Sequence, residues 1–327
     1  MKPKRPYHDL YDSGELKHRV NLLNKKLTSC TLCPRHCRVN RLKGEEGFCL
    51  SGRNPRLTHA VAHFGEEPVL SGTRGSGTLF FASCNLRCVY CQNWQISHCG
   101  SRGRQYEITC EKLADHMITL QREGCHNINF VSPSHCVAQI LEATFLAIGK
   151  GLDIPLVYNT NSYDDLETLK CLDGVIDIFL PDLKYADPVT GRQYSQALDY
   201  PMISRRAVRE MFRQVGPLKT DEHEIATRGL IIRHLILPND LAHTENTLRF
   251  IAQELSHDVT LSLMAQYYPT HKAKNIPLLS RCITAREYEK AVSLLEKLGL
   301  KEGWIQAHKG SPENYRPDFD REHPFIL

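Results

Sequence analysis

Three cysteines fall within eight residues of the chain, in the stretch FFASCNLRCVYCQNW. Cys84, Cys88 and Cys91 follow an apolar run and precede a polar turn. A structural zinc site takes four ligands and closes its shell, whereas each of the four irons in a 4Fe–4S cluster needs one external ligand. Three thiols therefore leave one iron open, and an open metal position is where a cofactor or substrate binds. The alternative is that the three are small buried hydrophobic side chains.

A second group of cysteines lies near the N-terminus. Cys30, Cys33, Cys37 and Cys49 have the spacing C-x2-C-x3-C-x11-C. Four thiols can complete a tetrahedral zinc shell or hold an auxiliary iron–sulfur cluster that relays electrons. Thiol ligands alone do not separate these metals, and unmetallated thiols are a third alternative. The spacing predicts a four-cysteine metal site.

The composition bounds the class of protein. The chain has 327 residues, 13 cysteines and a net charge of +4. It contains no apolar run of about 18 residues, so no membrane span is expected, and its basic start lacks the apolar core of a secretory signal. We expect a cytoplasmic protein whose reduced thiols serve metal binding or catalysis. The chain has no dense basic stripe with interleaved aromatic residues, so a nucleic-acid partner is not expected.

Short apolar segments alternate with helix-period segments from residue 78 onward. The predicted strands are residues 78–82, 127–131, 155–159, 174–180, 230–237 and 259–264. This alternation is typical of parallel βα units. We expect an α/β fold with a partial or full (β/α) barrel of about six parallel βα units, preceded by a small loop-rich cysteine module; a doubly wound sheet is the alternative. In both architectures function lies at the C-terminal ends of the strands, and Cys84 lies just past the first one.

Three parts are predicted along the chain. Residues 1–68 form an N-terminal extension with the four-cysteine module, residues 69–310 form the barrel domain, and residues 311–327 form a C-terminal tail.

The stretch CNLRCVYC resembles the radical S-adenosylmethionine (SAM) motif C-x3-C-x-aromatic-C, with Tyr90 in the aromatic position. Together with CTLCPRHCRVNRLKGEEGFC and LPDLKYAD, it is similar to a branch of the pyruvate formate-lyase-activating-enzyme superfamily from residue 30 to residue 270. The resemblance implies a 4Fe–4S cluster on Cys84, Cys88 and Cys91, with S-adenosyl-L-methionine on the open iron. Its reductive cleavage gives a 5′-deoxyadenosyl radical that abstracts hydrogen from the substrate. The resemblance also implies a one-electron donor such as flavodoxin or ferredoxin, and a protein as the substrate class.

Four further residues are assigned to the cofactor by the resemblance. Tyr90 and Gln92 flank the last cysteine, and in relatives the residues at these positions help to seat the adenine. The alternatives are core packing for Tyr90 and a surface position for Gln92. Asp182 and Lys184 match an Asp-x-Lys pair that contacts the cofactor. Positions i and i+2 of an extended segment point to one side, and a weak surface ion pair is the alternative.

The segment SPSH (132–135) stands where many relatives carry Gly-Gly-Glu, whose acid holds the methionyl amine. The acid is missing here, so this contact must be made differently. Ser132 or Ser134 either bonds the amine or caps a helix starting near Cys136, and the cap is the favoured interpretation.

Further polar residues follow the later predicted strands. Asn159 or Asn161 either meets the ribose or serves turn chemistry. Arg233, His234 and Gln266 stand where relatives make further cofactor contacts.

Two features separate the chain from known glycyl-radical activases. It has LSGTRGSGT where they carry an Asp-Gly-Pro-Gly-like segment, and it lacks their ferredoxin-like cysteine insert. Radical chemistry is therefore expected without glycyl-radical activation being implied. The alternatives are a non-catalytic zinc or iron–sulfur protein that binds or senses redox state, and a radical enzyme acting on tRNA.

Overall fold

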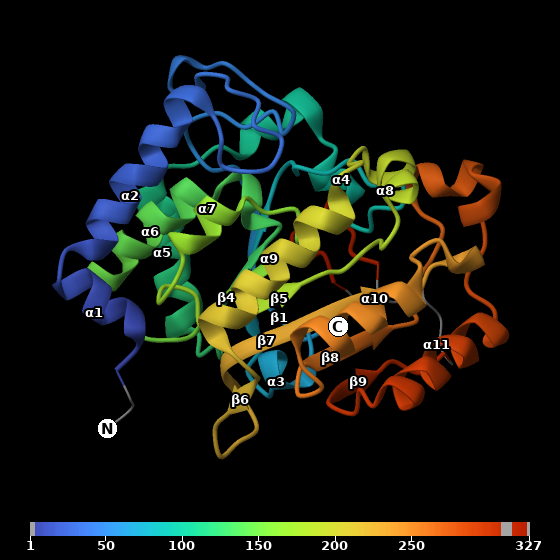
Figure 1. Ribbon diagram of the computed structural model, residues 1–327. Helices are drawn as coiled ribbons and strands as arrows, with labels where there is room; N and C mark the ends of the chain where they lie inside the picture. The colour runs from blue at the N-terminus through green and yellow to red at the C-terminus, as the bar shows by residue number, and fades with distance from the viewer. Residues whose placement is uncertain (1–3, 309–315, 326–327) are drawn as a thin grey trace.

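The computed structural model describes residues 4–308 and 316–325 of the chain. Its centre is a sheet in the order β1-β2-β3-β4-β5-β7-β8-β9, with β6 beside β7 (Figure 1). Seven strands run parallel: β2 (Ser76–Phe81), β3 (Ile128–Val131), β4 (Leu156–Thr160), β5 (Ile178–Pro181), β7 (Ala226–Leu235), β8 (Thr260–Met264) and β9 (Gly303–Ile305). The edge strand β1 (Leu57–His63) and the short β6 (Lys219–Thr220) pair antiparallel with β2 and β7.

The six predicted strands correspond to β2, β3, β4, β5, β7 and β8, so the α/β class with a mostly parallel sheet is confirmed. Every residue of β2, β3, β4 and β5 is buried. Both faces of a parallel sheet are covered, which is why these strands read as continuous apolar runs. The strand order runs from β1 to β9 without a pairing between these two edges in the described ranges. A closed barrel is therefore not confirmed.

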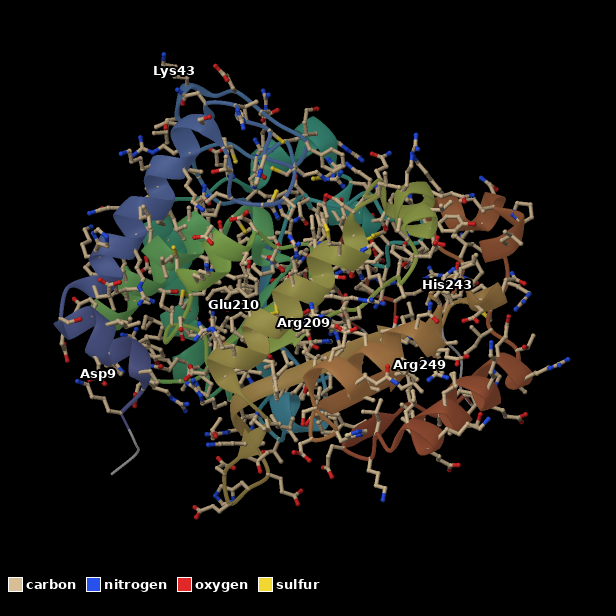
Figure 2. All side chains as sticks on the ribbon, in the orientation of Figure 1. Asp9, Lys43, Arg209, Glu210, His243 and Arg249 are labelled. Atoms are coloured by element: carbon tan, nitrogen blue, oxygen red, sulfur yellow. The ribbon has the colours of Figure 1, made fainter. Side chains whose placement is uncertain are left out.

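Helices cover the sheet and connect its strands (Figure 1). Along the chain they are α1 (Pro6–Asp12), α2 (Glu15–Lys26), α3 (Pro68–Ser71), α4 (Trp94–Ser97), α5 (Cys110–Arg122), α6 (Val137–Gly149), α7 (Leu166–Lys170), α8 (Pro188–Ser195), α9 (Tyr200–Val215), α10 (Thr244–Phe250) and α11 (Ala285–Leu298). Capping residues in the sequence set where several helices begin. Thr109 caps α5, and Thr284 with Glu287 forms a capping box on α11. Figure 2 shows charged side chains such as Arg209 on α9 and Arg249 on α10.

The helix α3 closes the N-terminal end of the parallel strands. Its Leu70 is fully buried and packs in one cluster with Val157, Ile178, Leu180 and Ile231 from β4, β5 and β7. Apolar side chains therefore fill this end of the sheet. The polar cavity described below lies beyond them, where the strands end.

The N-terminal cysteines lie in an irregular segment, as predicted. Between α2 and β1 the regular elements are the short 3₁₀ turns η1 (Leu27–Ser29) and η2 (Arg41–Lys43). The domain boundaries stay predictions, although β1, which precedes the boundary at residue 68, already belongs to the sheet. Of the predicted tail, residues 311–315 and 326–327 lie outside the described residues. Within the described ranges, every helix is too short or too polar to cross a membrane.

Candidate active site

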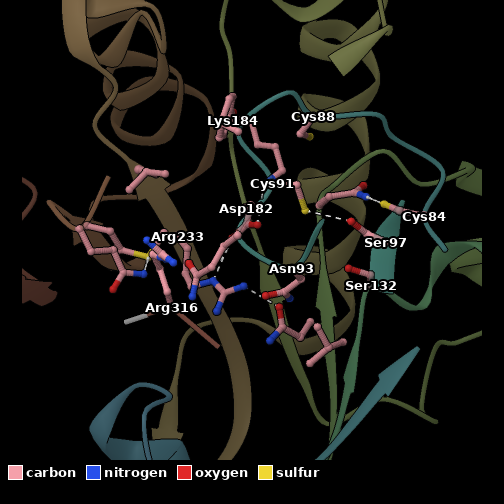
Figure 3. A pocket seen from close by; sticks show the side chains of 18 of the residues that line it. Cys84, Cys88, Cys91, Asn93, Ser97, Ser132, Asp182, Lys184, Arg233 and Arg316 are labelled. Atoms are coloured by element: carbon pink, nitrogen blue, oxygen red, sulfur yellow. Dashed lines mark hydrogen bonds and ion pairs between the residues drawn. The ribbon is translucent and has the colours of Figure 1, made fainter. Parts of the chain in front are cut away.

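A cavity of about 250 Å³ lies at the C-terminal ends of the parallel strands (Figure 3). Cys84, Cys88 and Cys91 all line it. Other residues singled out from the sequence line the same cavity: Tyr90, Gln92, Ser132, Asn159, Asn161, Asp182, Lys184, Arg233 and Gln266. The structure thus brings these residues together, while their roles toward a cofactor stay predictions.

Each of the three thiols has a polar side-chain partner from a different segment. The pairs are Asn161 Nδ2 with Cys84 Sγ at 3.3 Å, Ser195 Oγ with Cys88 Sγ at 2.9 Å, and Ser97 Oγ with Cys91 Sγ at 3.1 Å. Burial raises the pKa of Cys84 to about 11 and that of Cys91 to about 12, and the charge of Cys88 adds to both shifts. Cys84 and Cys91 are therefore neutral thiols at pH 7 until a metal displaces their protons.

The cysteine loop is held by arginines on both sides. Arg87 donates to the backbone carbonyl of Cys84 at 2.8 Å and also to that of Phe48. Arg35, in the segment of the N-terminal cysteines, donates to the carbonyl of Asn85 at 2.9 Å. This segment is thus bonded directly to the loop that carries the three thiols.

A charged network lies beside the thiols, with Arg233 at its centre (Figure 3). Arg233 donates to Asp182 at 2.8 Å, to Glu66 at 3.2 Å and to Asn159 at 2.6 Å. Lys184 Nζ lies 2.8 Å from the other oxygen of Asp182. The predicted pair of Asp182 and Lys184 exists, but both side chains are only 20% exposed and line the cavity, so it is not a surface pair.

The charges in this network fix the ionisation of its central acid. Burial acts to raise the pKa of Asp182, but the positive charges of Arg233 and Lys184 outweigh it and hold the pKa below its ordinary value. Asp182 is therefore a carboxylate at neutral pH. Carboxylates beside ammonium and guanidinium groups match both ends of an amino acid and the hydroxyls of a ribose.

Glu66 is a cavity residue that the sequence did not reveal. It follows β1, and its side chain is 7% exposed. Its Oε1 accepts from Asn129 at 3.1 Å and from Asn159 at 3.2 Å, and its Oε2 from Arg233. Burial raises the pKa of this carboxyl against the opposing pull of Arg233. The only sequence signal was a pair of acids in GEEP, ahead of the first predicted strand.

The predicted helix cap in SPSH is wrong. A 3₁₀ turn, η4 (Pro133–His135), comes first, and α6 starts after Cys136, which makes no side-chain cap bond. Ser134 Oγ instead lies 3.2 Å from Thr160 Oγ1. Ser132 makes no cap bond either and has a φ of 57°, in the left-handed region that a non-glycine residue rarely adopts.

Of the remaining predicted residues, Tyr90 lines the cavity and His234 lies behind it. Tyr90 is 8% exposed and packs edge-to-face against Tyr185 and Tyr267. His234 does not line the cavity: its Nδ1 lies 2.7 Å from the carbonyl of Leu183 and its Nε2 lies 3.0 Å from Thr244 Oγ1. His234 therefore supports the Asp182–Lys184 segment from behind.

The described part of the C-terminal tail forms a wall of the cavity. Arg316 and Phe325 are lining residues. Phe319 and Phe325 pack against Phe80 of β2, with ring centroids 5.2 and 5.6 Å away. The tail therefore shields the cavity on the side of β1 and β2.

The N-terminal cysteines meet around a second, much smaller cavity. Cys30, Cys33, Cys37 and Cys49 all line a space of about 10 Å³. In neither cysteine group, nor elsewhere in the described ranges, are three His, Cys, Asp or Glu side chains grouped so that they already form a site for one metal ion.

Residues 78–214 match the family model of the radical SAM superfamily. Two similar curated proteins come from Methanocaldococcus jannaschii. "Uncharacterized protein MJ0674" is 33% identical over 318 residues, covering 91% of this chain and 85% of the relative. "Uncharacterized protein MJ0808" is 23% identical over 274 residues, covering 78% of this chain and 75% of the relative.

Proposed function

The chain belongs to the radical SAM superfamily, and from this premise we propose that Cys84, Cys88 and Cys91 hold a 4Fe–4S cluster whose remaining iron binds S-adenosylmethionine. The observation that carries the proposal is that three thiols, each with its own hydrogen-bonding partner, line one cavity that also holds a charged network. No other cysteine of the described chain lines this cavity. The fourth iron would therefore stay open for the cofactor.

When bound, the cluster and S-adenosylmethionine supply a one-electron cleavage that yields a hydrogen-abstracting 5′-deoxyadenosyl radical. The side chains of this protein bind and orient the cofactor. Arg233 and Lys184 supply positive charge for its carboxylate, and Asp182 supplies an acceptor for its ribose or amine. Glu66 supplies the carboxylate that the SPSH segment lacks.

Other lining residues complete the proposed cofactor site. Tyr90 and Gln92 face the adenine, and Ser132 and Asn159 supply further polar contacts. Apolar side chains of the wall, including Phe80 and Tyr267, keep water from the reacting centre.

The narrower assignments rest on the resemblance alone. An activating-enzyme-like reaction on a protein substrate, electron delivery by flavodoxin or ferredoxin, and a cytoplasmic setting are part of the proposal. The substrate class is inferred by analogy within the superfamily.

The test is cofactor cleavage by anaerobically reconstituted protein. With dithionite and S-adenosylmethionine, the wild type and a Cys110→Ser control should form 5′-deoxyadenosine, and Cys84→Ser should not. Cys110 is also buried but does not line the cavity, so it controls for the loss of a core thiol. A metal-loaded wild type that leaves the cofactor intact would instead support the non-catalytic binding or redox-sensing protein.

A further inference from the structure

The four N-terminal cysteines surround one enclosed space. Cys30, Cys33 and Cys49 are 8%, 7% and 8% exposed, and Cys37 is half-buried. Leu32, Val39 and Phe48 supply apolar parts of the remaining lining, and two arginines and two histidines supply the basic parts. None of the described cysteines is in a disulfide. Four convergent thiols in an irregular segment need an explanation that a single buried cysteine does not.

The backbone around these thiols is folded tightly without helix or strand. The amide of Cys30 bonds the carbonyl of Val39 at 2.9 Å, and the amide of Arg38 bonds the carbonyl of Cys30 at 3.0 Å. His36 and Arg38 have φ values of 40° and 56°, in the left-handed region. Such conformations cost free energy and persist when the surroundings enforce them. A segment with so small a core needs a further crosslink to enforce them.

Hydrogen-bond donors also point toward the sulfur atoms. The amide of Phe48 donates to Cys37 Sγ at 3.4 Å. Gly47 packs so closely on this thiol that an added Cβ would lie 2.8 Å from the sulfur. An approach of this kind leaves no room for a side chain at position 47.

A buried cation supplies an independent sign of a missing anionic group. Arg41 lines the cavity and is 2% exposed. Its Nε donates to the carbonyl of Gly52 at 2.9 Å, and its Nη1 donates to that of His135 at 2.8 Å and lies 3.9 Å from Cys30 Sγ. Its Nη2 has no hydrogen-bond partner in the described part of the chain. A buried guanidinium is costly unless it is paired. Four thiolates around a divalent ion carry a net negative charge, which would pair this cation.

We propose that Cys30, Cys33, Cys37 and Cys49 bind one zinc ion that holds the N-terminal module against the loop of the radical-enzyme site. The cavity of about 10 Å³ is near the space of one water-sized probe, so a single ion requires a smaller movement of the thiols than an eight-atom cubane does. Four thiolates give zinc a closed tetrahedral shell. Because no three ligands are yet grouped for one ion, the thiols must move together as it binds.

The role of the ion follows from two contacts. Arg35, two residues after Cys33, donates to Asn85, and Phe48, next to Cys49, accepts from Arg87. Asn85 and Arg87 lie in the loop between Cys84 and Cys88. The ion therefore holds in place the two residues, Arg35 and Phe48, that bond this loop. This role rests on the proposed function, whereas zinc binding itself does not.

Metal analysis of the full-length protein, purified anaerobically, tests the site. The wild type should hold one zinc per chain. Cys33→Ser/Cys37→Ser should lose the zinc and keep cluster iron, whereas a Cys110→Ser/Cys171→Ser control should keep both. Cys110 and Cys171 are buried thiols that line neither cavity. Two results would overturn the proposal. One is a zinc content that does not change in the first variant. The other is a wild type that holds no zinc, combined with a first variant that loses iron.

Cobalt substitution keeps the test decisive if the first variant does not fold. In Cys84→Ser/Cys88→Ser/Cys91→Ser, cobalt can meet four thiols only at the N-terminal site. One bound cobalt with the charge-transfer and ligand-field bands of a tetrahedral tetrathiolate is expected. The absence of these bands would refute a four-thiol site, and either result is independent of cofactor cleavage.

Discussion

The two cysteine groups use nearly the same short spacings but differ in what surrounds them. Cys84, Cys88 and Cys91 line a polar, charged cavity of about 250 Å³. The four N-terminal cysteines close on a space of about 10 Å³, which apolar and basic side chains line together. On the two proposals above, the first group keeps room and charge for a ligand beside its cluster, and the second has room for little beyond the proposed zinc. The surroundings of the thiols would then separate a reactive site from a structural one.

Single serine substitutions in the two groups should have unequal effects. Cys88→Ser removes one of only three cluster ligands, so 5′-deoxyadenosine formation should fall to background. Cys37→Ser removes a zinc ligand and should leave measurable formation. Product analysis by chromatography, with zinc and iron contents measured on the same samples, checks both. Equal loss of product in the two variants would break the distinction.

The charged network should be the most costly part of the larger cavity to disrupt. Arg233→Leu leaves Asp182 and Glu66 without their shared cation, and breaking a buried pair costs about 3–5 kcal/mol. The free energy of unfolding should fall by this order, and S-adenosylmethionine should bind more weakly.

The matched control is Arg209→Leu, whose side chain is 43% exposed and pairs with Glu254 on the surface. It should change the free energy of unfolding by no more than about 0.5 kcal/mol. Chemical denaturation and calorimetric titration provide the two readouts. A comparable loss in both variants would argue against a special role for Arg233.

Hydrogen bonds to the cluster thiols should tune the larger site. Ser195 donates to Cys88 and lies 2.8 Å from the Tyr185 hydroxyl, forming a short chain. Ser195→Ala should weaken cluster retention by about 10- to 100-fold, as for other residues that orient metal ligands, and should make the reduction potential more negative.

Ser204→Ala is the control, because Ser204 is fully buried but bonds only the carbonyl of Pro201 in α9. Iron retention during dialysis and a redox titration followed by electron paramagnetic resonance measure the two effects. An unchanged potential in Ser195→Ala would contradict the assigned hydrogen bond.

The smallest expected effect is a pH dependence of the folding stability that comes from His234, which lies behind the charged network. Burial lowers the pKa of His234 from 6.5 to about 4, despite the opposing effect of the Leu183 carbonyl. The folded state therefore binds fewer protons than the unfolded state between these values, and stability falls as the pH drops through this range. The loss contributed by His234 should be about 1.5 kcal/mol between pH 6.5 and about pH 5.

The variant His234→Gln should lack this contribution, whereas His257→Gln, at an exposed position, should retain it. Urea unfolding at several pH values gives the comparison. A pH dependence that persists undiminished in His234→Gln would show that other groups cause it.

Much of the sheet was predictable because its signals are local. Strands such as β2 and β4 are short apolar runs that a parallel sheet buries on both faces. The thiols were found from their clustering, and Asp182 and Lys184 from the resemblance. The rule that function lies at the C-terminal strand ends agrees with both. By contrast, β9 has three residues with no buried position, so its sequence carries no strand signal.

The parts that were not predicted depend on tertiary contacts. Glu66 reaches the cavity because β1 returns antiparallel along β2, which no local pattern indicates. Phe325 becomes a wall residue only after the chain has passed the entire sheet. The cap assigned to Ser132 or Ser134 was wrong because the chain forms a 3₁₀ turn, Pro133–His135, before α6 begins.

The account depends most on an open iron in a cluster held by three thiols. Reduced, anaerobically prepared protein should give the electron paramagnetic resonance signal of a 4Fe–4S cluster. Electron–nuclear double resonance with S-adenosylmethionine labelled in its carboxylate and amine should show direct coupling to the iron. A signal that the labelled cofactor leaves unchanged, or a zinc ion found at Cys84, Cys88 and Cys91, would contradict it.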